Sequence, residues 1–554
     1  MPFPPSAKSA QSAAAFLLVA LALYANALLN PFLIDDLDAI VSHPDVVEPG
    51  GILRLWGHDY WAGRSPEDRN LYRPVVVASY WLNARVTGLS PTGFRVVNIA
   101  LLAGLGWLVC RWVVALAGDA KPQAAWGAWA AGLLVVCHPV HATVVNNIIG
   151  RADLLAMAGV VAFAVLQAQR RWTPFTISAA GLACVVALGS KETGLLLLPI
   201  ALAQYRTRTD VLIPGIAIAA YLLARIVIVG IVPHYATAAM DLTGNPLRGM
   251  GLWDRLPTAM SLVWLYLRET LWPTMRASFI PDALPGWSAA AAWAGAGVLL
   301  ALIGATTHAW KRRPALVVAG VLAVGNLLLI GNLLTPIGVY AGYRLMPPFI
   351  VATAILAVQR RHTLWIVLAA CVLGGGVVIA TNPDWRSHAS LMSANVARQP
   401  DNMRAHFLLG VALGELGRQR EGVEYVARAV QRHPESSQAR HEYGKMLIVL
   451  GRFDEAIANY QDLLRHHPED VQAMNQLAGL YMVREEFNLA HAWLSKATRI
   501  APTDAGILHN AAVLAAMTGQ INEALLRYEA LLREHPDHAA GRAEYDELRR
   551  QLQR

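Results

Sequence analysis

The C-terminal part of the chain contains five prolines at one constant spacing. They are Pro400, Pro434, Pro468, Pro502 and Pro536, and each lies 34 residues after the one before it. A period of 34 residues is typical of a unit of two antiparallel helices, and such units bury their apolar faces by stacking on one another. The spacing therefore predicts a helical solenoid of four units, at 403–436, 437–470, 471–504 and 505–538.

Small residues recur at two positions of these units. The eighth position holds Gly410, Gly444, Ala478 and Ala512, and the twentieth holds Gly422, Ala456, Ala490 and Ala524. Small side chains there allow close contact between the two helices of a unit, and large residues at the seventh and twenty-fourth positions fill the space around them. This is the pattern of the tetratricopeptide repeat (TPR). Because Pro400 continues the phase upstream, we expect a connecting helix or partial repeat at 384–402. The polar residues 539–554 are expected to form a capping helix that ends the stack.

Apolar segments dominate the first 383 residues. The whole chain is 55% hydrophobic and only 15% charged, which argues against a wholly soluble protein. A helix needs about 20 apolar residues to cross a membrane. Eleven segments approach this length, with loose boundaries, at 12–29, 93–117, 123–137, 152–169, 173–189, 192–205, 211–231, 288–309, 314–333, 337–357 and 363–381. The predicted fold class is all-α, with a transmembrane domain at 1–383 followed by the TPR solenoid.

Charged residues indicate the orientation of these spans. Basic residues concentrate in cytoplasmic loops, and here they fall in alternate loops, represented by Lys121, Arg170, Arg206, Lys311 and Arg360. The N-terminus is therefore expected in the cytoplasm. The outer face is expected to hold residues 30–92, 138–151, 190–192, 232–287, 334–337 and everything after 381. The amphipathic segments 74–87 and 256–272 are expected to lie along that face.

The charge balance also bears on partners. Residues 403–554 carry 18 basic and 20 acidic side chains, whereas the rest of the chain carries 28 and 18. A basic excess on the hydrophobic part favours contact with anionic membrane lipids over contact with nucleic acid.

Two adjacent carboxylates follow the first apolar segment. Asp35 and Asp36 lie in FLIDDLDAI, residues 32–40. Their mutual repulsion close to the bilayer is expected to raise the pKa of one relative to the other. Such a pair could supply a general base for an acceptor hydroxyl, while the second carboxylate orients the acceptor or binds a metal. A solvated helix cap is the alternative that spacing alone leaves open, and Asp38 is expected to be a surface carboxylate.

A second polar cluster lies between two predicted spans. The segment CHPVHATVVNNIIGRADLLA, residues 137–156, contains His138, His141, Arg151 and Asp153. Two histidines without a third ligand are a weak metal signal, so a divalent metal requirement stays open. Arg151 could form bidentate hydrogen bonds to a phosphate or an ion pair with Asp153.

Three further motifs add charges near the outer face. SKETG, residues 190–194, contributes Lys191 and Glu192, which are functional candidates because charges at the membrane are costly. YAGYRLMPPF, residues 340–349, places Arg344 within an apolar stretch, and LYRP, residues 71–74, contributes Tyr72 and Arg73. The outer face would thus hold one acidic centre and several separated cations. The cations suit a donor with a lipid phosphate, whose leaving group needs charge stabilisation, and the acidic centre could supply a base for the attacking group.

These motifs, in this order, resemble the transmembrane and TPR-containing protein O-mannosyltransferases, a branch of the GT-C glycosyltransferase superfamily. The resemblance is carried by the motifs above together with WGHDYW (56–61), LYRPVVV (71–77), GFRVVN (93–98), NPL (245–247), YRLMPP (343–348) and the trailing repeats. It implies a GT-C fold of about eleven spans, a polyprenyl-phosphate sugar as donor and inverting transfer to a Ser or Thr hydroxyl of a protein. It also implies residue roles: Asp35 or Asp36 as catalytic base, Arg151 and Arg344 at the lipid phosphate, and His138, His141, Lys191 and Glu192 along the pocket.

We therefore expect a multi-pass glycosyltransferase of a bacterial inner membrane, with the sugar expected to be mannose and the TPR domain in the periplasm. The groove of the TPR array would bind a protein or peptide acceptor or a partner protein. The polyprenyl-phosphate sugar is the expected donor substrate, and a divalent metal stays open as a cofactor. Two alternatives stay open. One is a GT-C transferase that modifies a glycan or a lipid, and the other is a non-catalytic membrane scaffold that recruits proteins through its repeats.

Overall fold

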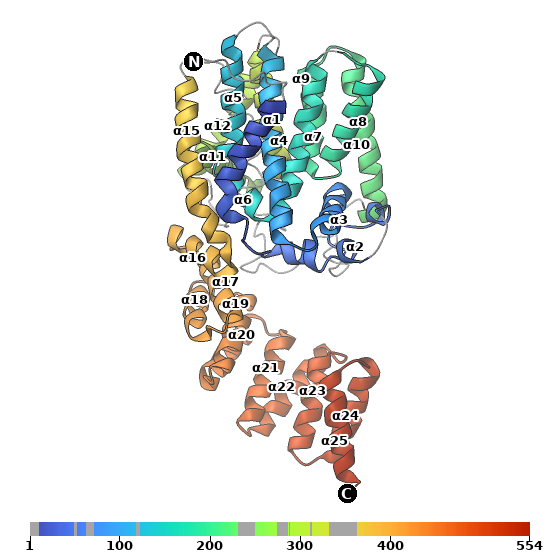
Figure 1. Cartoon of the computed structure of the whole chain (residues 1–554). Helices are drawn as coiled ribbons and strands as arrows, with labels where there is room; N and C mark the ends of the chain where they lie inside the picture. Colours follow the sequence, from blue (N-terminus) through green and yellow to red (C-terminus); the bar gives the residue numbers. More distant parts are fainter. Residues whose placement is uncertain are drawn as a thin grey trace. The chain divides into compact units, whose positions relative to one another are not determined.

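The computed structural model describes residues 10–48, 52–62, 71–117, 122–169, 171–230, 250–273, 288–310, 313–331 and 363–553, together with Leu247 and Gly286. All regular secondary structure in these ranges is helical (Figure 1), so the all-α prediction is confirmed for them. The predicted span 337–357 and Arg344 lie outside the described residues, as do Lys121, Arg170, Lys311 and Arg360.

The chain divides into two compact units. The first contains the residues up to Gln399 apart from 239–244, and the second contains the residues from Pro400 onward. The helices of the first unit are α1 (Ala10–Tyr24), α2 (Pro44–Val47), α3 (Pro74–Thr87), α4 (Pro91–Ala117), α5 (Pro122–Cys137), α6 (Val140–Asn146), α7 (Arg151–Ala168), α8 (Pro174–Leu188), α9 (Leu197–Ala203), α10 (Arg208–Val229), α11 (Leu252–Leu271), α12 (Ala290–Ala309), α13 (Pro314–Ile330), α15 (Thr363–Thr381) and α16 (His388–Arg398).

Five helices in the described part of the chain are long and apolar enough to cross a membrane. They are Pro91–Leu116, Ile148–Ala168, Arg208–Val229, Ala290–Ala309 and Leu364–Arg386, which correspond to α4, α7, α10, α12 and α15. The bent pair α5–α6 makes a sixth if it is counted as one span. The other predicted segments in these ranges form shorter apolar helices, at α1, α8, α9 and α13. The positions of the predicted segments therefore match helices wherever the structure describes them, while the total of eleven spans stays a prediction.

The segment 138–151, predicted to lie on the outer side of the membrane, is largely helical. It forms α6 and the short 3₁₀ helix η5 (Ile148–Gly150). α6 follows α5 after a bend of 58°. Its apolar residues Ala142, Val144 and Val145 are fully buried, so burial of this apolar face explains why the segment folds inward.

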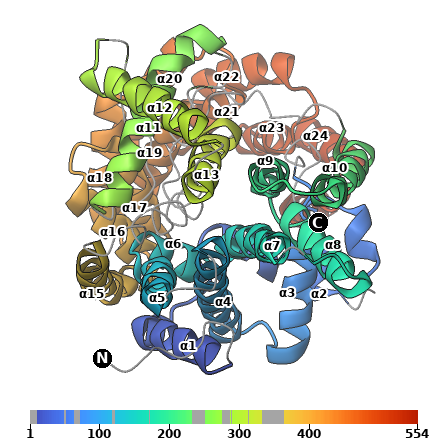
Figure 2. The ribbon, with the colours of Figure 1, turned by 90° about the horizontal axis from the view of Figure 1, so that it is seen from above.

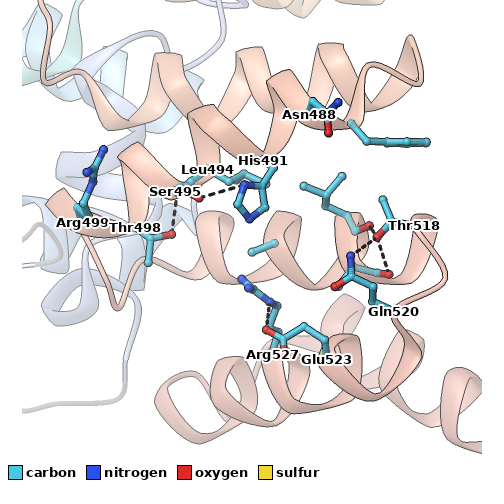
Figure 3. A pocket seen from close by; sticks show the side chains of 14 residues that line it. Asn488, His491, Leu494, Ser495, Thr498, Arg499, Thr518, Gln520, Glu523 and Arg527 are labelled. Carbon is cyan, nitrogen blue, oxygen red and sulfur yellow. Dashed lines mark hydrogen bonds and ion pairs between the residues drawn. The ribbon is translucent and has the colours of Figure 1, made fainter.

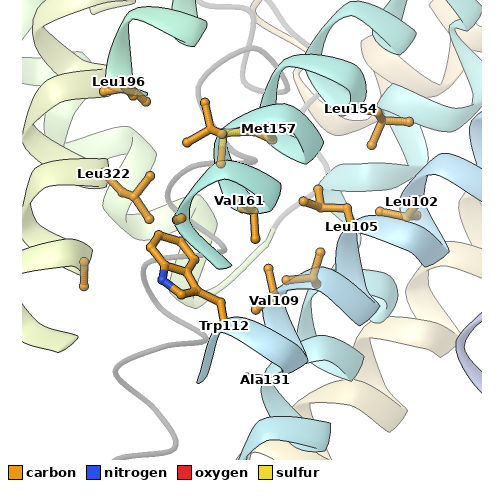
Figure 4. Close-up of a cluster of buried hydrophobic side chains, with 14 of the residues drawn as sticks. Leu102, Leu105, Val109, Trp112, Ala131, Leu154, Met157, Val161, Leu196 and Leu322 are labelled. Atoms are coloured by element: carbon orange, nitrogen blue, oxygen red, sulfur yellow. The ribbon is translucent and has the colours of Figure 1, made fainter. Parts of the chain in front are cut away.

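α4 and α7 form the centre of the first unit. Figure 2 shows α4 surrounded by α1, α5 and α7, and Figure 4 shows Leu105, Val109 and Trp112 of α4 in one buried cluster with Met157 and Val161 of α7. Small residues permit close approach of α4 and α5: a Cβ atom on Gly132 would lie 2.5 Å from the carbonyl oxygen of Gly106. Membrane helices commonly use such small residues where their backbones meet.

The second unit is a row of antiparallel helix pairs. Its helices are α17 (Met403–Glu415), α18 (Gln419–Arg432), α19 (Ser437–Val449), α20 (Phe453–His466), α21 (Val471–Val483), α22 (Phe487–Ile500), α23 (Ala505–Met517), α24 (Ile521–Glu534) and α25 (Ala539–Leu552). The periodic prolines lie two residues before the N-caps Asn402, Ser436, Asp470 and Asp504, whose side chains accept hydrogen bonds from backbone N–H groups in the first turn. Each unit therefore begins where a proline ends the preceding helix and a polar cap starts the next.

The small residues of the first repeat lie where the sequence predicts them. A Cβ atom on Gly410 would lie 2.8 Å from the carbonyl oxygen of Gly422. Gly417, Gly451 and Gly519 have positive φ angles at the turns within their pairs, and Glu485 takes the corresponding conformation in the third repeat. The turns thus use residues that tolerate left-handed backbone in three of the four pairs.

Candidate active site

The loop that carries the acidic pair is held by a buried arginine of α4. Arg95 donates hydrogen bonds to the backbone carbonyl oxygens of Asn30 at 2.5 Å, Pro31 at 3.1 Å and Asn146 at 3.2 Å. Its side chain is fully buried. One cation therefore ties the segment before Asp35 to the end of α6. Arg95 was not predicted as a site residue, although the GFRVVN motif contains it.

Three buried asparagines add to this attachment. The side-chain amide of Asn30 donates to Asn146 Oδ1 at 2.9 Å and to the Asn382 carbonyl oxygen at 3.0 Å. Asn146 donates in turn to Asn382 Oδ1 at 2.9 Å. The network joins the loop after α1, the end of α6 and the residue that follows α15, and satisfied buried networks of this kind fix a single geometry.

The backbone next to the acidic pair has an unusual conformation. Ile34 has a φ of 53°, which is rare for a β-branched residue. A π-helical turn, η2 (Leu37–Val41), follows the pair directly. Strained residues and π-helical turns both concentrate at functional sites, which makes this loop the first place to look for chemistry.

The two carboxylates have different environments. Asp36 is fully buried and accepts hydrogen bonds from the backbone N–H groups of Leu33 at 3.3 Å and Ile149 at 3.0 Å. Burial raises the pKa of Asp36 to about 7, although these N–H groups and Arg95 oppose the shift. Burial, rather than the expected repulsion between the two carboxylates, is the main cause of this raised pKa. Asp35 is half-buried and Asp38 is exposed.

Tyr60 links the acidic pair to Arg73. The Tyr60 side chain is buried, and the guanidinium of Arg73 lies 5.5 Å from the centre of its ring. Burial raises the pKa of Tyr60, Arg73 lowers it, and Asp35 and Asp36 add smaller upward contributions. All three charged groups therefore lie within electrostatic reach of this hydroxyl. Tyr60 belongs to the WGHDYW motif, but the sequence alone did not single it out.

Arg73 takes part in one of two neighbouring ion pairs. Arg73 Nη2 is 2.9 Å from Glu192 Oε2, and Lys191 Nζ is 2.5 Å from Asp153 Oδ1, with both members of the second pair buried. The segments meet through a hydrogen bond from the Val75 N–H to the Gly189 carbonyl oxygen. The structure thus brings Arg73, Asp153, Lys191 and Glu192 together, and their role in one pocket stays a prediction.

Two polar atoms in this region have no hydrogen-bond partner among the described residues. They are Arg73 Nε and the hydroxyl oxygen of Ser190, both buried. A buried donor without a partner is costly, and a bound oxyanion could accept hydrogen bonds from both groups. Tyr72 lies alongside, and its hydroxyl donates to the Trp56 carbonyl oxygen at 2.9 Å.

Arg151 lies within electrostatic reach of Asp36 and Tyr60, but its donors are occupied. It is fully buried and donates to Asn98 Oδ1, Asn83 Oδ1 and the carbonyl oxygens of Ser79 and Phe94. The alternative of an ion pair with Asp153 is not what the structure shows, because Asp153 pairs with Lys191. This geometry favours a role for Arg151 in holding α3, α4 and α7 together.

The histidines point to backbone groups of different helices. His138 Nε2 is 3.1 Å from the carbonyl oxygen of Thr270 in α11, and His141 Nδ1 is 2.7 Å from the carbonyl oxygen of Val135 in α5. No cluster of three or more His, Cys, Asp or Glu side chains suited to a metal occurs within the described ranges. The two rings therefore have structural contacts, and a ligand for them stays a prediction.

Comparisons with known proteins agree with the family resemblance. A tetratricopeptide repeat family model matches residues 389–437 and 444–505. The human protein O-mannosyl-transferase TMTC4 is 34% identical over 151 residues, which are 25% of this chain and 20% of that protein. Protein O-mannosyl-transferase F38B6.6 of Caenorhabditis elegans is 31% identical over 189 residues, 32% of this chain and 26% of that protein. Human TMTC1 is 36% identical over 138 residues, 24% of this chain and 15% of that protein.

These matches span between 15 and 26% of the length of the three relatives. The predicted similarity to TMTC proteins is confirmed over that part. Among solved structures, a tetratricopeptide repeat protein from Parabacteroides merdae is 18% identical with a TM-score of 0.28, over 31% of this chain and 68% of that one. The TPR protein TTC0263 of Thermus thermophilus is 20% identical with a TM-score of 0.26, over 32% of this chain and 95% of that one.

Proposed function

We propose that this chain is an integral-membrane protein O-mannosyltransferase that transfers mannose from a polyprenyl-phosphate donor to Ser or Thr hydroxyls of a protein. The reaction would take place on the outer, periplasmic face of a bacterial inner membrane. The similarity to proteins named O-mannosyl-transferases supports the reaction class. The observation that carries the proposal is that Arg73 and the acidic pair lie within electrostatic reach of Tyr60, while Arg73 also neighbours Asp153 of the buried Lys191–Asp153 pair.

Asp35 is the better candidate for the catalytic base. It is half-buried, whereas Asp36 is fully buried and its two carboxylate oxygens accept backbone hydrogen bonds. In the proposed reaction, Asp35 accepts the proton of the acceptor hydroxyl, whose oxygen forms a bond to the anomeric carbon as the bond from that carbon to the phosphate oxygen breaks. Asp36 holds the loop in position. General bases of this kind contribute about 10²- to 10⁴-fold in rate.

Arg73 and Lys191 are the proposed ligands of the donor phosphate. Cations placed where negative charge develops on a leaving group stabilise the transition state. The unpartnered Nε of Arg73 and the hydroxyl of Ser190 supply two further donors in the same region. We propose Arg344 as a further ligand of this phosphate only because it lies in the family motif YRLMPP.

The catalytic assignment can be tested with a matched pair of variants. We expect Asp35→Asn to lower transfer of radiolabelled mannose from the polyprenyl-phosphate donor by at least about 100-fold, because an amide cannot accept the proton. Asp38→Asn removes an exposed carboxylate on the same loop and should leave transfer unchanged. Wild-type activity in Asp35→Asn, with normal thermal unfolding, would reject Asp35 as the base.

A further inference from the structure

The TPR unit contains a groove between its third and fourth repeats. Its volume is about 620 Å³, its walls are α22 and α24, and residues of α23 form its floor (Figure 3). Pockets of a few hundred Å³ are typical of binding sites for small ligands or side chains. The groove lies between the second helices of consecutive repeats.

Two alanines of the fourth repeat account for this groove. Ala511 and Ala515 occupy the seventh and eleventh positions of the repeat and line the floor. The same two positions hold larger side chains in the other three repeats, namely Leu409 and Leu413, Tyr443 and Leu447, and Leu477 and Tyr481. The fourth repeat is therefore the one with the smallest side chains at these two positions, and the large residue expected at the seventh position is absent.

The groove combines an apolar floor with a charged rim that has one more basic than acidic side chain. Leu494 and Leu514 are buried beside the two alanines. The charged lining residues are Arg499, Arg527 and Glu523, and Arg527 Nε pairs with Glu523 Oε1 at 2.7 Å. Arg499 lies at one end of α22 and has no ion-pair partner among the described residues. His491 projects from α22 into the groove in Figure 3.

We propose that this groove binds a segment of a partner protein that carries one bulky apolar side chain flanked by acidic residues. The apolar side chain would occupy the volume above Ala511 and Ala515, where the other repeats place their own leucine or tyrosine. One acidic residue of the segment would pair with Arg499. Another would compete with Glu523 for the guanidinium of Arg527. A central apolar anchor with a complementary charged rim is the usual anatomy of a peptide site. The proposal goes beyond the transferase reaction and does not depend on it.

The test measures binding of fluorescent peptides to the full-length chain in lipid nanodiscs. Each peptide has about ten residues, enough to extend along the groove, with a central Leu, Phe or Tyr between glutamates. The comparison peptides have lysines in place of the glutamates, or Ala in place of the anchor. We expect the acidic peptide with a bulky anchor to bind at least about tenfold more tightly than either comparison peptide, a difference of about 1.4 kcal/mol.

Two variants connect that binding to the groove. Ala511→Leu combined with Ala515→Tyr gives the fourth repeat the residues that the third repeat has at these two positions. This filled variant should weaken peptide binding at least about tenfold, while its thermal stability stays equal or rises. Arg499→Glu should remove the preference for acidic over lysine-containing peptides. Gly479→Ala is the control, since nothing lies within 4 Å of a Cβ atom at that position, and it should bind as the wild type does.

Three outcomes would overturn the proposal. They are equal binding of all peptides, wild-type affinity in the filled variant, and an unchanged charge preference in Arg499→Glu. If the filled variant does not fold, Arg499→Glu and the anchor-free peptide still decide the question. Because the readout is binding, loss of transferase activity would neither support nor contradict it.

Discussion

Asp36 is a carboxyl group enclosed by the protein, and burial raises its pKa from 3.8 to about 7. Between these values the folded chain holds a proton that the unfolded chain has released. The free energy of unfolding must therefore fall as the pH rises through this window, by on the order of 1 kcal/mol per pH unit. Asp36→Asn keeps the uncharged state, so we expect it to lose this dependence in thermal unfolding between about pH 4 and 8.

Asp38→Asn is the matched control for this measurement, because Asp38 is exposed. It should show the same pH dependence of unfolding as the wild type. A slope in Asp36→Asn equal to that of the wild type would mean that Asp36 is not the group that holds the proton.

At the scale of helices, α4 offers two glycines with opposite surroundings. A Cβ atom on Gly106 would lie 2.7 Å from Val136 Cγ2 and 2.9 Å from the Gly132 carbonyl oxygen, whereas nothing lies within 4 Å of one on Gly104. Gly106→Ala must therefore separate α4 from α5, and we expect it to lower the free energy of unfolding by about 1–3 kcal/mol. Gly104→Ala should be neutral or stabilising by up to about 1 kcal/mol. Denaturation of both variants in the same detergent compares them directly, and equal effects would contradict close packing at Gly106.

Helices and repeats were predictable because they depend on local pattern. The 34-residue proline period places the N-cap of the first helix of each repeat, and the apolar segments match helices wherever they are described. Partners across long sequence separations were not predictable. Nothing local indicates that Arg151 contacts Asn83 and Asn98 while Asp153 pairs with Lys191. The network of Asn30, Asn146 and Asn382 is a similar case, since its members look like ordinary polar residues at helix ends.

At the scale of the whole chain, the candidate chemistry and the repeats belong to different units. Asp35, Arg73 and Lys191 lie in the first unit, so deletion of residues 403–554 should leave binding of the labelled polyprenyl-phosphate donor intact. We expect the same deletion to abolish transfer to a folded protein acceptor. Binding assays and transfer assays on one preparation measure both properties. Unchanged transfer would exclude the repeats as the platform for the acceptor.

Ala511 and Ala515 also bear on how such arrays diversify. All four repeats share one register, so each has a counterpart of these two positions. A change of side-chain size at that pair opens or closes a groove without altering the helix lengths, the prolines or the caps. Two substitutions could therefore shift the binding groove from one repeat to the next. Two arrays with the same backbone structure could in this way bind different partners.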